Sequence, residues 1–250
     1  CESNVKEIYD LTWELKKKPG HIVANQFEEM ANYRFHYHVT GNAAWEGAQQ
    51  LAEAGKCSSN VSAFISSMGS AGTIAAADRL KQLSPHMKIV GLEPIQCPTL
   101  YNNGYGGHDI QGIGDKHVTW IHNVLNMDAI MCIDDIESKQ GLQLLTDPVG
   151  KRLLVEQGID AETVEFLSTV MGISGVCNVI GAIKTAKHYG MTSDDTIVTV
   201  ATDAIDRYGS VMAQLDERFG EMDEIKANVR LEHIFRGQKT DFIEEGTAMN

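Results

Sequence analysis

A run of five small residues stands where the sequence could bind an anion. Residues 69–73 follow an apolar stretch at 61–67 that is typical of a buried strand, and they precede a helical pattern at 74–83. The first N–H groups of a helix have no partner within it and point toward the preceding loop, where the helix dipole also attracts negative charge. The sequence therefore predicts that a phosphate is held by Gly69, Ser70, Ala71, Gly72 and Thr73.

Two familiar nucleotide motifs do not describe this segment. A P-loop would need Gly-Lys-Ser or Gly-Lys-Thr after the turn, and neither follows. The spacing also differs from the Gly-x-Gly-x-x-Gly of dinucleotide-binding proteins, although Glu93 lies about twenty residues further on, where an acidic residue would bind a ribose. Small residues at a strand-to-helix turn also serve tight packing. The local pattern alone leaves phosphate binding and packing as equal hypotheses.

Apolar runs and helical periodicities alternate along most of the chain. We expect strands at 21–24, 61–67, 88–93, 129–133 and 196–201. Helices are expected at 4–18, 45–54, 74–83, 137–146, 148–157, 161–170, 172–188 and 208–218. This order predicts an α/β fold with a parallel twisted sheet and helices on both of its faces. The polar tail after Gly220 shows no assignable pattern. His36 and His38 fall on a segment expected to be extended, without a third ligand, so no metal site is predicted.

Four blocks, taken in order, resemble the cysteine synthase and cystathionine β-synthase family of pyridoxal-phosphate (PLP) enzymes of fold type II. The blocks are 25–28 with 36–41, 67–74 with 90–94, 108–114, and 172–175 with 196–208. The third block, His-Asp-Ile-Gln-Gly-Ile-Gly, is similar to the family's His-x-Ile-Gln-Gly-Ile-Gly. The resemblance extends over residues 5–212, and the order and spacing of the blocks are more specific than any one of them.

The resemblance implies a role for each of several residues. Residues 69–73 would hold the phosphate of PLP, and Gln26 would help to bind the carboxylate of the substrate. Gly112 and Gly114 would line the substrate side of the cofactor, where glycine lets the backbone come close. Surface polarity for Gln26 and a plain turn for the two glycines are the alternatives. Ala71 stands where the family usually has glycine, and a positive φ angle there would be strained by its Cβ.

The partner of the PLP ring nitrogen departs from the family pattern. The family usually places a serine hydroxyl after the last strand, and Ala204 occupies that position here. Thr202 or Asp203 could replace it, and the sequence favours Thr202 as the hydroxyl donor. A hydroxyl would leave the ring nitrogen unprotonated, whereas a carboxylate would favour a protonated ring and a stronger electron sink.

The Schiff-base lysine of the family has no counterpart in this sequence. It lies upstream of the matching region, together with the Ser/Thr-Gly-Asn loop that binds the substrate carboxylate. Lysines elsewhere sit in no matching context and are expected at the surface: Lys56, Lys81, Lys88, Lys116, Lys139, Lys151, Lys184 and Lys187. We therefore assign no catalytic residue within the chain and expect it to form no covalent link to PLP by itself.

A helical pattern begins close to Cys1, which suggests a sequence cut from a longer one. By the resemblance, residues 1–26 would be the end of a small N-terminal α/β domain, and residues 27–250 would form the large domain that binds the PLP phosphate.

The resemblance implies PLP-dependent β-replacement or β-elimination on a small amino acid by the full-length enzyme, a lyase or transferase, in a homodimer. Alternatives are a threonine synthase-like enzyme, the PLP subunit of an amino-ketoacid thiolase, or a non-catalytic binding subunit that kept the fold. The net charge of −13 argues against nucleic-acid or anionic-membrane partners. Five scattered cysteines without a Cys-x-x-Cys pair favour a reducing, cytoplasmic location.

Overall fold

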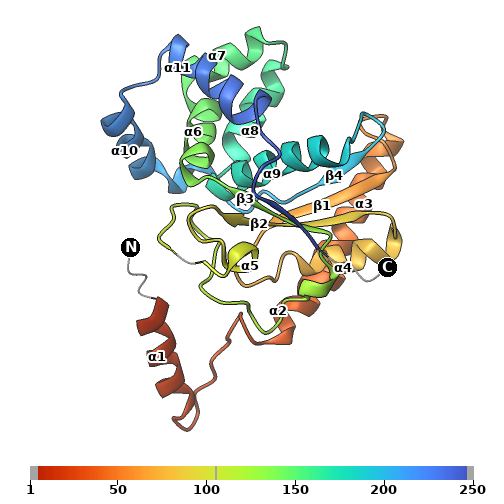
Figure 1. The fold of residues 1–250 in the computed structure, drawn as a ribbon, viewed down its shortest axis with the longest axis vertical. Coiled ribbons are helices and arrows are strands. Elements are labelled where there is room, and N and C mark those ends of the chain that lie inside the picture. Colours follow the sequence, from red (N-terminus) through yellow and green to blue (C-terminus); the bar gives the residue numbers. More distant parts are fainter. Residues whose placement is uncertain (1–4, 105, 247–250) are drawn as a thin grey trace.

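A five-stranded sheet crosses the centre of the molecule (Figure 1). The computed structural model describes residues 5–104 and 106–246. The strands lie in the order β4-β1-β2-β3-β5, and their bounds are β1 (Val61–Ser67), β2 (Lys88–Pro94), β3 (Ala129–Ile133), β4 (Thr196–Val198) and β5 (Ile243–Glu245). Strands β1 to β4 run parallel, as expected, and β5 pairs antiparallel with β3. The α/β class is confirmed.

Helices cover both faces of this sheet, as predicted (Figure 1). The helices are α1 (Val5–Lys16), α2 (Met30–Phe35), α3 (Gly41–Glu53), α4 (Ala75–Leu83), α5 (Thr99–Asn102), α6 (Asp135–Thr146), α7 (Pro148–Glu156), α8 (Ala161–Val170), α9 (Ile173–Tyr189), α10 (Gly209–Phe219) and α11 (Glu224–Arg230). The strands are buried on both sides, which explains their near-continuous apolar sequences.

Successive side chains of β1 point to opposite faces of the sheet, so the core has two layers. Ala63 and Ile65 pack with α6 and α9 on one face. Phe64 points to the other face and packs against α3 and α4, for example against Leu80. A third cluster joins α6, α7, α8 and α11 into a helical lobe beside the sheet. The sheet is therefore held between two helical layers, and its strand ends are fixed in position.

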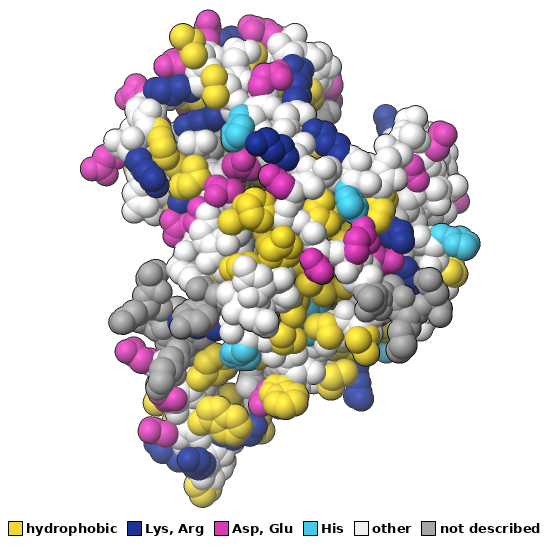
Figure 2. All heavy atoms as spheres, viewed as in Figure 1, with side chains coloured by type: hydrophobic (Ala, Val, Ile, Leu, Met, Phe, Trp, Pro, Cys, Tyr) yellow, Lys and Arg dark blue, Asp and Glu magenta, His cyan; other side chains and the backbone are white. Residues whose placement is uncertain are grey.

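Helix α1 stands away from the sheet (Figure 1). Hydrophobic side chains gather on it in Figure 2, and Ile8, Leu11 and Trp13 are all exposed. Its link to the rest of the molecule includes the ring of Tyr9, whose centroid lies 5.6 Å from that of Phe27. No helix in the described part of the chain has both the length and the apolar character needed to cross a membrane.

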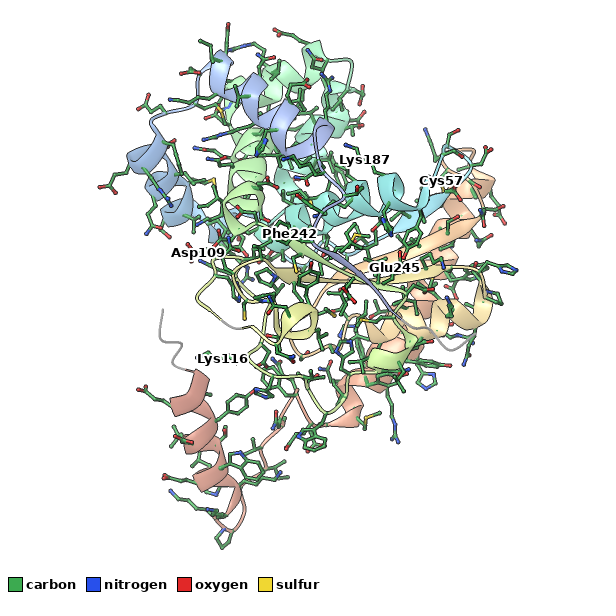
Figure 3. All side chains as sticks on the ribbon, viewed as in Figure 1. Cys57, Asp109, Lys116, Lys187, Phe242 and Glu245 are labelled. Atoms are coloured by element: carbon green, nitrogen blue, oxygen red, sulfur yellow. The ribbon has the colours of Figure 1, made fainter. Side chains whose placement is uncertain are left out.

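The tail after Gly220 has regular structure that the sequence did not reveal. It forms α11, a π-helical turn at Leu231–Arg236 and strand β5. Lys187 of α9 donates hydrogen bonds to the carbonyl oxygens of Arg236 and Gln238, and Figure 3 shows Lys187 beside this segment. The prediction that 196–201 is the last strand was wrong, because β4 ends at Val198 and the antiparallel β5 follows it. Strand β5 has only three residues, and its stability comes from pairing with β3 rather than from a local pattern.

Two local predictions in the N-terminal part were also wrong. Residues 21–24 form no strand, and none of the strands in the described part of the chain pairs with them. His36 and His38 lie in a π-helical turn, His36–Thr40, that joins α2 to α3, rather than in an extended segment. Helical context on both sides outweighs their short alternating pattern. Among the described residues, no group of three or more His, Cys, Asp or Glu side chains could hold a metal ion.

Candidate functional site

The strand order creates a crevice beside the carboxyl end of β1. The chain continues from β1 to β2 on one side, and β4 lies on the other side of β1. Direct pairing of β1 with β4 ends at Phe64 and Val198, so the segments that follow diverge. Open α/β sheets bind ligands at such a switch point, outside the carboxyl ends of the strands. The five-residue loop 69–73 follows β1 at this point.

A cavity of about 310 Å³ occupies the crevice. It brings together nearly all of the residues predicted for the site, from segments far apart in the sequence. Its lining consists of Gln26, Ser66, Ser67, Gly69, Ser70, Ala71, Gly72, Thr73, Gln111, Gly112, Ile113, Ser174, Thr202 and Asp203. Of the residues expected at the site, Gly114 alone is not part of this lining. Its N–H donates to the carbonyl oxygen of Met68 at 2.7 Å, which joins the 108–114 loop to the end of β1.

The loop at 69–73 is held from outside the cavity. The amide of Asn32 donates to Ser70 Oγ at 3.0 Å and to the carbonyl oxygen of Gln26 at 2.9 Å. The hydroxyl of Thr119 donates to the carbonyl oxygen of Ser70 at 2.9 Å. Within the described residues, no side chain caps the N-terminus of α4. The N–H groups of Ala75, Ala76 and Ala77 donate to the carbonyl oxygens of residues 72–74. Within the described residues, the N–H groups of Thr73 and Ile74 have no such partner, so an anion in the cavity could use them.

Ala71 adopts the left-handed conformation, with a φ angle of 63°. The sequence raised this as a conditional expectation, and the structure confirms that a Cβ sits at a position where glycine would be unstrained. The side chain is 4% exposed and packs among the core residues near α4. Alanine at this position is therefore destabilised by backbone strain and stabilised by the burial of its methyl group.

We expect Ala71→Gly to change the free energy of unfolding by less than about 1 kcal/mol. Relief of left-handed strain gains about 1–2 kcal/mol. The lost methyl group costs about 0.8 kcal/mol, and the freer unfolded chain costs about 0.4–1 kcal/mol. Urea denaturation followed by circular dichroism measures the difference. A decrease of more than about 2 kcal/mol in the free energy of unfolding would mean that relief of strain does not compensate for the lost methyl group.

Thr202 and Asp203, which follow β4, also line the cavity. The hydroxyls of Thr202 and Ser174 are hydrogen-bonded at 2.6 Å. One carboxylate oxygen of Asp203, Oδ2, accepts a hydrogen bond from the hydroxyl of Tyr208. Burial and this hydrogen bond raise the pKa of Tyr208 well above its usual value, so the phenol stays protonated and acts as the donor. Both candidates for the ring-nitrogen partner therefore face the cavity.

Several residues at the site escaped the sequence analysis. Asn178 of α9 accepts a hydrogen bond from the N–H of Ser67 and donates one to the carbonyl oxygen of Val200, each at 2.8 Å. Asn32 and Thr119 hold the loop at 69–73. None of the three carries a local signal, because their partners lie far away in the sequence. Ser174 was within a block that resembles the family and could have been singled out from it.

Two lysines expected at the surface are in fact buried. Lys139 is 7% exposed and pairs with Asp109 at 2.7 Å; Asp109 is labelled in Figure 3. Lys184 is 2% exposed and donates to the carbonyl oxygen of Cys132 at 3.2 Å. Burial of a lysine is tolerated where a carboxylate or carbonyl compensates its charge, and such partners are visible only in the tertiary structure. No lysine is found among the described residues that line the cavity.

Comparisons with known proteins agree with this architecture. No family model matches the chain. A cysteine synthase of Staphylococcus aureus is 30% identical over 196 residues, which are 78% of this chain and 54% of that protein. An O-ureido-L-serine synthase of Streptomyces lavendulae is 26% identical over 177 residues, or 70% of this chain and 46% of that protein. The chain spans about half the length of these curated relatives.

A solved structure gives the same result for the fold. The O-acetyl serine sulfhydrylase isoform 3 of Entamoeba histolytica superimposes with a TM-score of 0.69 at 24% identity, covering 91% of this chain and 58% of that one. Fold and crevice define an α/β protein of the fold type II class. Within that class, the chain belongs to the cysteine synthase and cystathionine β-synthase family of PLP enzymes.

Proposed function

We propose that this chain is the cofactor-binding part of a PLP-dependent enzyme that performs β-replacement or β-elimination on a small amino acid. The observation that carries the proposal is the single cavity that joins the 69–73 loop, Gln26 and the 111–113 loop. The relatives named cysteine synthase and O-ureido-L-serine synthase make amino acids that differ at the β-carbon, which supports this reaction class.

The cavity suits the cofactor in shape and in the chemistry of its lining. Backbone N–H groups of residues 69–73 and the hydroxyl of Thr73 would bind the phosphate. A Cβ on Gly69 would lie 3.3 Å from the carbonyl oxygen of Gly112, which is tighter than most such contacts, so glycine there eases the close approach of the two loops. When bound, PLP supplies an electron sink for the pair left on Cα after a proton is removed.

The other lining residues would position the substrate. Gln26 and the backbone of Gly112 lie on the same cavity as the phosphate loop and would bind the substrate carboxylate. We propose that the assembled enzyme is a homodimer.

Binding of pyridoxine 5′-phosphate to the 250-residue chain tests the proposal. This compound has the ring and phosphate of PLP but no aldehyde, so it reports the non-covalent site. We expect binding in isothermal titration calorimetry at least about tenfold tighter than that of pyridoxine, since a charge-assisted phosphate contact contributes more than about 1.4 kcal/mol. Equal affinity for the two compounds, or no binding of either, would overturn the proposal.

We further propose that the Schiff-base lysine comes from outside this chain, on a longer polypeptide or on a partner. The absence of lysine from the described cavity lining supports this. After incubation with one equivalent of PLP and borohydride reduction, mass spectrometry is expected to show no single lysine preferentially labelled. Stoichiometric labelling of one lysine would show that the chain carries its own.

A non-catalytic PLP-fold subunit is the second candidate, favoured by the same cavity lining. The remaining alternatives, a threonine synthase-like enzyme and the PLP subunit of an amino-ketoacid thiolase, use the same phosphate site. One assay distinguishes these candidates. The region that carries the lysine is supplied, on the full polypeptide or as a separate chain, and the formation of cysteine from O-acetylserine and sulfide is measured. Cysteine formation supports β-replacement, and its absence with PLP bound favours the other candidates.

A further inference from the structure

The lining of the cavity includes an acceptor that lacks a partner among the described residues. Asp203 lines it, and Oδ1 of this carboxylate is buried without a hydrogen-bond partner in the structure. The other oxygen, Oδ2, already accepts from the hydroxyl of Tyr208. An unpaired buried acceptor is costly, by about 1–3 kcal/mol and more when it is charged. Such a group is expected where a ligand supplies the missing donor.

The residues around Asp203 leave its Oδ1 atom without a partner. A Cβ on Gly172 would overlap Oδ1 of Asp203, so glycine at the start of α9 makes room for the carboxylate. The hydroxyl of Thr202 is engaged with Ser174 at 2.6 Å, whereas Oδ1 of Asp203 has no competing partner. The terminal torsion of an aspartate is soft, so a small rotation presents this oxygen to a donor in the cavity.

Few charged groups compete with Asp203. Tyr208 follows it on the same segment, and Asp206 and Arg207 are exposed and line a neighbouring, more open pocket with Asp203. The residues that face the cavity from α9 and from the phosphate loop are Ser174, Ser70 and Thr73, none of which titrates near neutral pH. Among the described residues that line the cavity, Asp203 is therefore the one carboxylate.

We propose that Asp203, rather than Thr202, binds the ring nitrogen of the cofactor and holds it as a pyridinium. This inference rests on the proposed PLP site. The Asp203 carboxylate would accept a hydrogen bond from the N–H of the ring, with the proton supplied by solvent. A protonated ring withdraws electrons more strongly than one that accepts a hydroxyl hydrogen bond. The site thus combines an anion-binding loop at one end with a carboxylate for a cationic N–H at the other.

The test follows the ring nitrogen itself. Pyridoxine 5′-phosphate labelled with nitrogen-15 in the ring is bound to the 250-residue chain, and its NMR shift is recorded against pH, free and in the complex. An opposite charge within hydrogen-bonding distance favours the charged form by about one to three pH units. We expect the pyridinium to persist to a pH higher by that amount in the complex, and this increase to be lost in Asp203→Asn.

Asparagine keeps the shape of the side chain and an acceptor for Tyr208, so Asp203→Asn is expected to fold. Circular dichroism and retained binding of the phosphate ester check this. Asp206→Asn removes the same charge from an exposed neighbour and is expected to leave the nitrogen titration of the complex unchanged. The control separates a direct contact from a general change in charge.

Three results would overturn the inference. An unaltered titration in Asp203→Asn would exclude Asp203, and a change in Thr202→Val alone would assign the role to the hydroxyl. In both cases, continued binding of the phosphate ester would show that the proposed cofactor site still holds. Failure of the unmodified chain to bind the phosphate ester would overturn the proposed function together with this inference.

Discussion

Replacement of Asn178 with leucine is expected to lower the free energy of unfolding by about 2–5 kcal/mol. Asn178 is 1% exposed, and its amide bridges the N–H of Ser67 and the carbonyl oxygen of Val200 at 2.8 Å each. Leucine has a similar volume but leaves both half-buried backbone groups without this partner, and an unpaired buried group costs about 1–3 kcal/mol. Urea denaturation of the two proteins, followed by circular dichroism, measures the loss.

Asn178→Leu should also lower the affinity of the chain for the ligand. Ser67 immediately precedes the turn that leads into the phosphate loop, so its release disturbs the loop and weakens binding of pyridoxine 5′-phosphate. Asn228→Leu is the matched control, because Asn228 is exposed on α11 and donates only to a carbonyl oxygen one helical turn away. A surface change of this kind alters stability by less than about 0.5 kcal/mol. Equal losses for the two variants would contradict the bridging role of Asn178.

Substitution of Gly72 by alanine is expected to weaken binding of pyridoxine 5′-phosphate about tenfold or more. The new Cβ would overlap the amide of Asn32. That amide fixes Ser70 Oγ and the carbonyl oxygen of Gln26, at 3.0 and 2.9 Å. Two hydrogen bonds of about 0.5–1.5 kcal/mol each are then lost from the support of the loop. Calorimetric titration of the variant gives the change in affinity directly.

Gly47→Ala provides the control for the added methyl group. Gly47 lies inside α3, and a Cβ there would meet no atom within 4 Å. Alanine in a helix interior is more favourable than glycine, so this variant should gain about 0.5–1 kcal/mol in stability. Its affinity for the phosphate ester should equal that of the unmodified chain. Unchanged affinity in Gly72→Ala would show that Asn32 does not support the binding loop.

Much of the central architecture could be predicted from local patterns. Strands β1, β2 and β3 follow from short apolar runs bounded by turns, and the 69–73 loop from small residues between a strand and a helix. These signals are local because both faces of the strands are buried and the loop must be narrow. Ala71 was the one loop residue whose conformation could be stated only conditionally, since its identity does not determine its φ angle.

Other features depend on contacts between distant segments. The support given by Asn32 and Asn178 joins residues separated by 38 and 111 positions, and no local pattern encodes such pairs. Strand β5 gains its backbone partners only from β3, so a polar tail became part of the sheet. Lys139 and Lys184 were misplaced at the surface for the same reason, because the groups that compensate their charge lie elsewhere in the chain.

The sequence by itself determined which residues could bind a phosphate and the α/β class that would present them, because periodicity and small-residue turns act over a few neighbouring positions. The tertiary structure alone decided that the loop after β1 and the segment after β4 share one cavity, and that Asp203 lines it while one of its oxygens stays unpaired. Strand order sets that meeting point, and strand order is fixed by packing of the whole sheet rather than by any segment of it.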